Sequence, residues 1–308
     1  MPEPRIPHRS TTPRPVGANQ VEQVAVVGGG VMGVGIVHAF LGGECRVTLV
    51  DVSTERVNAC VAQLHGIIDG GVTRGKLTGE QARAMADRLA TAESIEDLPD
   101  GLDLAIEAVP ERLPLKHETL GRMAARQPRL LATNTSALSI DLLAQGIAAA
   151  GDFLGLHFFN PVWASRLVEI VLGSATTDRA RSTALDVVAQ IGKRAIVVAD
   201  SPGFATSRLG IALGLEAMRM LEDGVASVED IDQAMMLGYK HPVGPLMLTD
   251  IVGLDVRLDV ASNLSQAYGS RFEPPRILRE LVADGALGQK TGRGFYAWDG
   301  DHAKPSAA

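Results

Sequence analysis

Short apolar runs alternate with longer segments of helical periodicity between Val24 and Asp200. Continuous runs rich in valine, isoleucine and leucine are typical of strands that are buried on both faces of a sheet. Such strands are predicted at 24–27, 46–50, 102–108, 130–133, 153–156, 167–172 and 194–198. Helices are predicted between them at 31–41, 55–68, 79–89, 115–125 and 179–191. This alternation predicts an α/β fold with a doubly wound, mostly parallel sheet.

The pattern changes after Asp200, where Ser201-Pro202-Gly203 interrupts it and no further strand is predicted. Helical periodicity continues at 209–221, 227–237, 245–252, 254–268 and 275–282. We therefore predict an all-helical C-terminal domain at 201–308, which follows an α/β domain at 21–200. The apolar helix faces exceed what one thin layer would bury, so the helical domain is also predicted to form a homodimer interface.

Composition limits the possible functions. A chain of 308 residues can bury a core in each of two domains, and its net charge of −7 favours neither nucleic acid nor a membrane surface. The two cysteines have no metal-ligand spacing. Residues 1–20 are rich in proline and arginine, and we predict a disordered tail there. There is no signal peptide or membrane-spanning run, so the predicted compartment is the cytoplasm.

A glycine motif joins the first predicted strand to the first helix. Gly28, Gly30 and Gly33 have the spacing G-x-G-x-x-G. In a Rossmann-type fold these glycines permit a tight turn and a close approach of a pyrophosphate to the backbone and to the helix N-terminus. We predict a dinucleotide site that includes these glycines and the residues between the last two of them, Val31 and Met32.

An acidic residue, Asp51, ends the second predicted strand. A carboxylate about 20 residues after the glycines accepts hydrogen bonds from ribose hydroxyls and repels a 2′-phosphate. Arg56 lies nearby and could tolerate that phosphate, but Asp51 favours NAD over NADP. The cofactor is therefore predicted to be NAD.

His157 and Glu169 stand on consecutive predicted strands. Glu169 lies within the apolar run LVEIVL, and an acid there is costly to bury without a partner. The nearest titratable candidate is His157, and a histidine oriented by a carboxylate can abstract a proton. This stretch alone leaves open a core histidine that is satisfied by a backbone carbonyl.

Other polar residues follow strands that end at the predicted cofactor crevice. Glu111 and Lys116 follow one of these strands, although surface residues near a helix start need no function. Asn134 and Ser136 end the next strand, where they could contact a ligand or form a turn.

The whole set of motifs resembles the NAD-dependent 3-hydroxyacyl-CoA dehydrogenase family, in particular its compact 3-hydroxybutyryl-CoA dehydrogenases. The resemblance extends from about Val24 to Trp298. The motifs are GGGVMGVGI, EAVPE, NTSALSI, GLHFFNPVWASRLVEIV, DSPGFATSR, DIDQAM, HPVGPLMLTDIVGLD and KTGRGFY. The last three lie in the helical region, where a generic dinucleotide-binding protein would not have them.

This resemblance implies roles for individual residues. His157 would take the proton of the 3-hydroxyl while a hydride passes to the nicotinamide, and Glu169 would hold the imidazole. Ser136 would hydrogen-bond the substrate oxygen. The nicotinamide end of the cofactor would be contacted by Asn134, Glu111 and Lys116, with Asn160 also in the cofactor site.

Two positions depart from the family pattern. Ser207 stands where the family has an asparagine that helps to polarise the substrate oxygen, and Trp163-Ala164-Ser165 replaces a Pro-x-Met pattern beside the acyl pocket. Both changes affect which acyl chain length and which exact substrate the site would accept.

The expected activity is reversible NAD-dependent oxidation of a short-chain (S)-3-hydroxyacyl-CoA. A related dehydrogenase acting on a free acid or on a carrier-bound acyl group is one alternative. An NAD-binding protein without catalytic activity is another.

Overall fold

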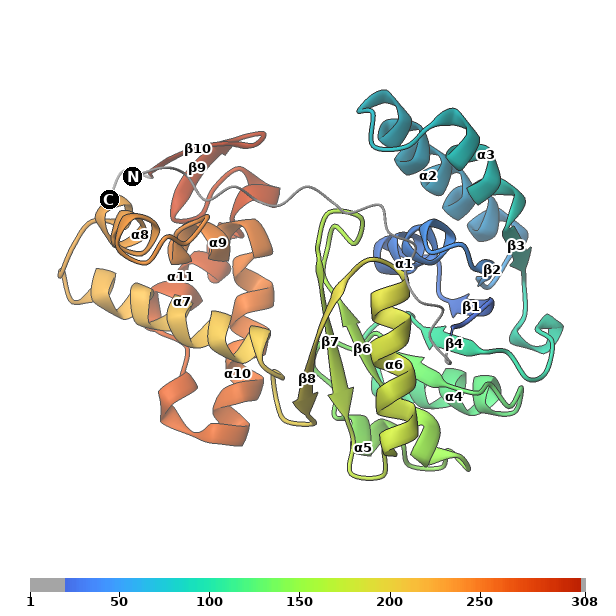
Figure 1. The fold of residues 1–308 in the computed structure, drawn as a ribbon. Coiled ribbons are helices and arrows are strands. Elements are labelled where there is room, and N and C mark those ends of the chain that lie inside the picture. The colour runs from blue at the N-terminus through green and yellow to red at the C-terminus, as the bar shows by residue number, and fades with distance from the viewer. Residues whose placement is uncertain (1–19, 306–308) are drawn as a thin grey trace.

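The computed structural model describes residues 20–305 of the chain. An eight-stranded sheet lies beside a group of helices that is formed by the second part of the chain (Figure 1). The predicted disordered tail lies outside the described residues except for Gln20. Among the described residues, no helix is long and apolar enough to cross a membrane.

The sheet has the strand order β3-β2-β1-β4-β5-β6-β7-β8. All neighbouring strands are parallel except β6 and β7, which pair in antiparallel fashion. The bounds are β1 Gln23–Val27, β2 Arg46–Val50, β3 Leu89–Ala92, β4 Leu104–Glu107, β5 Leu131–Thr133, β6 Phe153–Phe158, β7 Leu167–Leu172 and β8 Arg194–Ala199. The predicted doubly wound, mostly parallel sheet is therefore present.

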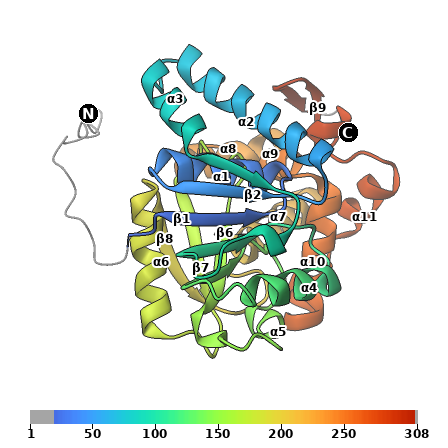
Figure 2. The same ribbon diagram turned by 90° about the vertical axis from the view of Figure 1, so that its right-hand side faces the viewer.

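Helices cover both faces of this sheet (Figure 2). On β1, Val24 and Val26 belong to the core beneath α1 (Val31–Gly42), α2 (Thr54–Thr73) and α6 (Asp178–Gln190). Ala25 and Val27 belong instead to the core beneath α4 (Leu113–Ala124) and α5 (Ile140–Leu143). Because successive strand residues point to opposite faces, burial on both sides requires the continuous apolar runs seen in the sequence. A further helix, α3 (Gly79–Asp87), follows α2.

The C-terminal region is built around α7 (Thr206–Glu222), α8 (Val228–Gln233), α9 (Pro245–Val252), α10 (Leu254–Tyr268) and α11 (Arg276–Ala283). These helices share a third apolar core. The region also contains an antiparallel hairpin, β9 (Tyr296–Asp299) and β10 (His302–Pro305), which the sequence did not predict. The buried carboxylate of Asp250 anchors the hairpin, because it accepts hydrogen bonds from Tyr296 N at 2.9 Å and from Trp298 Nε1 at 2.8 Å.

Candidate active site

The glycine loop between β1 and α1 has little room for side chains on its inner side. Gly28 has φ +104°, and a Cβ there would lie 2.7 Å from the carbonyl group of Ala108. A Cβ at Gly33 would lie 1.8 Å from the oxygen of Gly28, so α1 could not approach the loop as it does. At Gly30 an added Cβ would meet no atom within 4 Å, because this residue faces an open cavity.

The cavity beside this loop has a volume of about 890 Å³. It extends along the carboxyl ends of β1, β2, β4 and β5, where ligands bind in open α/β sheets. Its lining includes most of the predicted site residues, namely Gly28, Gly30, Val31, Met32, Asp51, Glu111, Lys116, Asn134, Ser136, His157 and Asn160. The exposed backbone at the N-terminus of α1, the open side of Gly30 and the nearby carboxylate together fit a dinucleotide.

Asp51 is fixed at the end of β2 by two backbone groups. Its Oδ2 accepts a hydrogen bond from Gly29 N at 2.8 Å, and its Oδ1 accepts one from Val52 N at 2.7 Å. The exposed Arg56 lies 3.7 Å from Oδ2 and forms an ion pair with it. The arginine that could have accepted a 2′-phosphate is therefore engaged by the same carboxylate.

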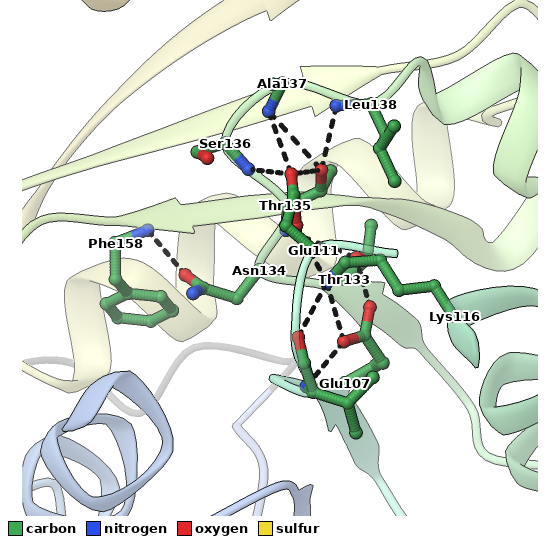
Figure 3. A network of polar contacts seen from close by, with 11 residues as sticks. Glu107, Glu111, Lys116, Thr133, Asn134, Thr135, Ser136, Ala137, Leu138 and Phe158 are labelled. Carbon is green, nitrogen blue, oxygen red and sulfur yellow. Dashed lines mark hydrogen bonds and ion pairs between the residues drawn. The ribbon is translucent and has the colours of Figure 1, made fainter. Parts of the chain in front are cut away.

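A network of polar contacts around Lys116 lies at the wall of the cavity (Figure 3). The side chain of Lys116 is 1% exposed, and its Nζ lies 2.8 Å from Glu107 Oε1 and 3.1 Å from Glu111 Oε2. Burial raises the pKa of Glu107, although the Lys116 ammonium and the Thr133 hydroxyl oppose this shift. Burial would also raise the pKa of Glu111, but Lys116 and the Thr135 hydroxyl outweigh it and hold the pKa below its usual value.

The same network shapes the loop that follows β5. Glu111 Oε1 accepts hydrogen bonds from Ser136 N at 3.0 Å and Ala137 N at 3.1 Å, so the carboxylate holds this loop at the edge of the cavity. Asn134 Oδ1 accepts a hydrogen bond from Phe158 N at 2.9 Å, which connects the loop to the end of β6. Figure 3 shows the side chain of Asn134 between this loop and Phe158.

His157 and Glu169 are direct cross-strand partners on β6 and β7. His157 Nδ1 lies 2.7 Å from Glu169 Oε2, so the pairing predicted from the sequence is present. Glu169 is fully buried, whereas His157 is 6% exposed and lines the cavity. If Nδ1 carries a proton and donates it to the carboxylate, Nε2 is the nitrogen that can accept a second proton.

The other contacts of Glu169 come from the start of α7. Its Oε1 accepts hydrogen bonds from Ala205 N at 3.2 Å and Thr206 N at 2.9 Å, and its Oε2 accepts one from Thr206 Oγ1 at 2.9 Å. Burial favours the neutral acid, but the hydrogen bonds with His157 and Thr206 outweigh it and lower the pKa of Glu169. An ionised carboxylate at a helix N-terminus also agrees with the direction of the helix dipole.

The sequence did not identify every residue of this site. Glu107 was missed, although it is an acid at the end of an apolar strand, the same signal that identified Glu169. Thr206 was also missed, because its contact with Glu169 spans 37 positions and carries no local pattern. Ser207 lies in the first turn of α7, one residue after Thr206, and does not line the cofactor cavity.

A second cavity of about 630 Å³ lies between α1, α2 and the turn after Asn160. Trp163, which is 41% exposed, and Ala164 line it from that turn. Two cations, Arg74 and Lys76, line it from the connection between α2 and α3. This cavity therefore combines positive charge with an accessible aromatic ring.

Comparison with known proteins agrees with this arrangement. The family model for the NAD binding domain of 3-hydroxyacyl-CoA dehydrogenase matches residues 23–201, and the model for the C-terminal domain of the same family matches residues 203–298. A 3-hydroxybutyryl-CoA dehydrogenase from Bradyrhizobium diazoefficiens is 36% identical over 288 residues, which cover 92% of this chain and 97% of that protein.

Other relatives are similar over the same region. A 3-hydroxyadipyl-CoA dehydrogenase from Escherichia coli is 38% identical over 282 residues, or 90% of this chain and 59% of that longer protein. The crystal structure of (S)-3-hydroxybutyryl-CoA dehydrogenase from Ralstonia eutropha has a TM-score of 0.87 at 37% identity, covering 91% of this chain and all of that one. The two family models together span the described sheet and helices, so this chain belongs to the NAD-dependent 3-hydroxyacyl-CoA dehydrogenase family.

Proposed function

We propose that this protein catalyses the reversible oxidation of a short-chain (S)-3-hydroxyacyl-CoA to the 3-oxoacyl-CoA with NAD. The observation that carries this proposal is the 2.7 Å contact between His157 and the buried Glu169 at the wall of the cavity that contains the glycine loop. When bound, NAD would supply the hydride acceptor. The chain itself would supply the base, the polar contacts and the shape of the site.

His157 would act as the general base for the 3-hydroxyl, and in the reverse direction its imidazolium would protonate the oxygen that forms at C3. Glu169 would fix the tautomer and stabilise the positive charge that develops on the ring. The low pKa of Glu169 supports this role, because the carboxylate stays ionised near neutral pH.

The remaining predicted residues would orient the substrate and the cofactor. Ser136, which is exposed to the cavity, would hydrogen-bond the substrate oxygen, and Ser207 would contribute a weaker donor from α7. Asn134 and Asn160 would contact the nicotinamide end of the cofactor. The network of Glu107, Glu111 and Lys116 supports this part of the site by holding the loop after β5.

The second cavity supports an acyl-CoA rather than a free acid. The phosphates of CoA are anionic, and Arg74 and Lys76 provide cations on the side of the turn opposite to the cofactor cavity. A free hydroxy acid has no group that would reach them. This argument favours the CoA ester over a free acid.

The test of this proposal is the consumption of NADH with acetoacetyl-CoA, acetoacetate and an acetoacetyl-carrier protein as parallel substrates. We expect turnover with the CoA ester and little with the other two. Turnover of only the free acid or the carrier-bound group would replace the proposal by the related dehydrogenase activity. NAD binding without turnover of any substrate would indicate a protein that has lost its catalytic activity.

Replacing Asp51 with alanine should reverse the cofactor preference. The change removes the acceptor for the ribose hydroxyls and leaves Arg56 available for a 2′-phosphate, so we expect kcat/KM with NAD to fall by about tenfold to a hundredfold. The ratio of kcat/KM values for NADPH and NADH measures the change. The matched control is Glu55→Ala, which removes an exposed acid from the first turn of α2, the helix that carries Arg56. An unchanged ratio in D51A would contradict the role of Asp51.

Replacing Ser207 with asparagine should raise kcat/KM for acetoacetyl-CoA. The longer amide can reach a substrate oxygen that the serine hydroxyl contacts weakly, and one well-placed donor contributes about 2.7–4 kcal/mol in a comparable site, so even a partial gain is measurable. Ser207→Ala should lower the rate in the same assay. A lower rate with asparagine would mean that the pocket is adapted to serine.

We also propose a homodimer that is formed through the helical region. Four exposed apolar side chains support it, namely Leu209, Ile251, Val252 and Val256 on or beside α7, α9 and α10. Apolar side chains that stay exposed on helices of one shared core favour an interface between subunits. The location in the cytoplasm stays a prediction.

A further inference from the structure

A short turn at residues 161–165 separates the two cavities. On one side Asn160, which precedes the turn, lines the cofactor cavity. On the other side Trp163 and Ala164 line the second cavity. The position of this turn therefore affects the second cavity, where the indole ring of Trp163 forms part of the wall.

The inner side of the turn is packed against α1. Val162 is 1% exposed, and its Cβ lies so close to Gly35 that a Cβ added at the glycine would be 2.8 Å from it. Within the turn, Ala164 N and Ser165 N both donate hydrogen bonds to Pro161 O, at 3.0 and 2.9 Å. These contacts do not use the carbonyl groups of Val162 and Ser165.

Lys193 binds both of these carbonyl groups. It lies between α6 and β8, and its Nζ donates hydrogen bonds to Val162 O and Ser165 O, each at 2.6 Å. Burial lowers the pKa of Lys193, so the surrounding protein opposes the positive charge of the ammonium. A partly buried ammonium placed between two carbonyl groups of one turn fixes the distance between them.

We infer that Lys193 is a positioning residue for the acyl-CoA substrate, because it holds the turn 161–165 and thereby places Trp163 at the wall of the second cavity. This inference rests on the proposed function. Lys193 lines neither cavity, so it acts through the turn and not by contact with the substrate.

The kinetic test compares Lys193→Met with Lys193→Arg and with Arg194→Met. The methionine has a similar length but no donor, and the arginine can restore two hydrogen bonds. Arg194 is the exposed neighbour and controls for the loss of a positive charge at this place. We expect K193M to raise KM for acetoacetyl-CoA by about tenfold, as the loss of hydrogen bonds to a charged group would give. We expect kcat and the Kd of NAD to change by less than about threefold.

In K193R the KM for acetoacetyl-CoA should return most of the way to the wild-type value. In R194M the KM should equal that of the wild type. An unchanged KM in K193M, or a fall in kcat with an unchanged KM, would overturn the inference. If K193M does not bind NAD and is therefore misfolded, Lys193→Gln is measured against the same criteria. An absence of turnover in the wild type would contradict the proposed function, and the fluorescence measurement below would still test whether Lys193 holds the turn.

Fluorescence provides a readout of the turn itself, and it is measured on samples that bind NAD and are therefore folded. The chain has two tryptophans, so Trp298→Phe leaves Trp163 as the only one. In that background we expect K193M to shift the emission of Trp163 to longer wavelength and to increase its quenching by acrylamide. Emission and quenching equal to those of the W298F parent would show that Lys193 does not hold the turn.

Discussion

Replacing His157 with alanine is expected to lower kcat for acetoacetyl-CoA reduction by about 10³-fold, within the range that a positioned general acid or base contributes. Among the residues that the structure describes, His157 is the only histidine that lines the cofactor cavity, and a buried carboxylate holds its ring. The affinity for NAD should change little, because the glycine loop and Asp51 are formed by other strands. The measurements are steady-state kinetics and NADH binding by fluorescence.

The matched control for this variant is His65→Ala. His65 is an exposed histidine on α2 that lines neither cavity, so its loss should leave kcat unchanged. If H157A retained a substantial part of the wild-type kcat, the base would have to be another group. If H157A lost NAD affinity by a factor similar to its loss in kcat, the histidine would instead have a structural role in the cofactor site.

Replacing Glu169 with glutamine should lower kcat by about 10³-fold, because the general base loses its orientation; in another catalytic triad the change of the acid to an amide costs about 10⁴-fold. The amide nitrogen can donate to the ring of His157 and so favour the wrong tautomer. It also cannot stabilise a positive imidazolium. Glu216→Gln changes an exposed acid on α7 and should have no such effect.

The same variant should change how stability depends on pH. Because the folded-state pKa of Glu169 is lowered, its carboxylate stabilises the fold fully above the ordinary glutamate pKa of 4.5. That contribution is lost as the pH falls below 4.5 and through the lower folded value. In E169Q the free energy of unfolding, measured with urea at a series of pH values, should therefore fall less steeply in acid. An equal slope in both proteins would mean that Glu169 does not titrate on unfolding.

Much of the fold was predictable because burial on both faces produces continuous apolar strands. The bounds of α9 and α10 agree with the prediction at both ends. The strand β3 was missed because its sequence, LATA, is only half buried and has few large apolar residues. The hairpin of β9 and β10 was missed because buried Asp250, and not an apolar pattern, holds it in place.

The site was predictable where a residue was chemically unusual for its place. Glu169 in an apolar strand required a partner, and His157 was the nearest candidate. Their direct pairing depends on the antiparallel register of β6 and β7, which local patterns do not determine. The contacts of Thr206 with Glu169 and of Lys193 with the 161–165 turn depend on tertiary packing alone, so the sequence could not indicate them.

The hydrogen bonds that Ala205 and Thr206 donate to Glu169 have a consequence for protein engineering. A chimera that joins this sheet to the helices of a relative would recombine the chain between β8 and α7, where the two family models also meet. Such a graft would keep the glycine loop and Asp51 intact but could displace the donors that hold the carboxylate. The crossover point should therefore lie after Thr206, so that the histidine, its acid and the start of α7 are inherited together.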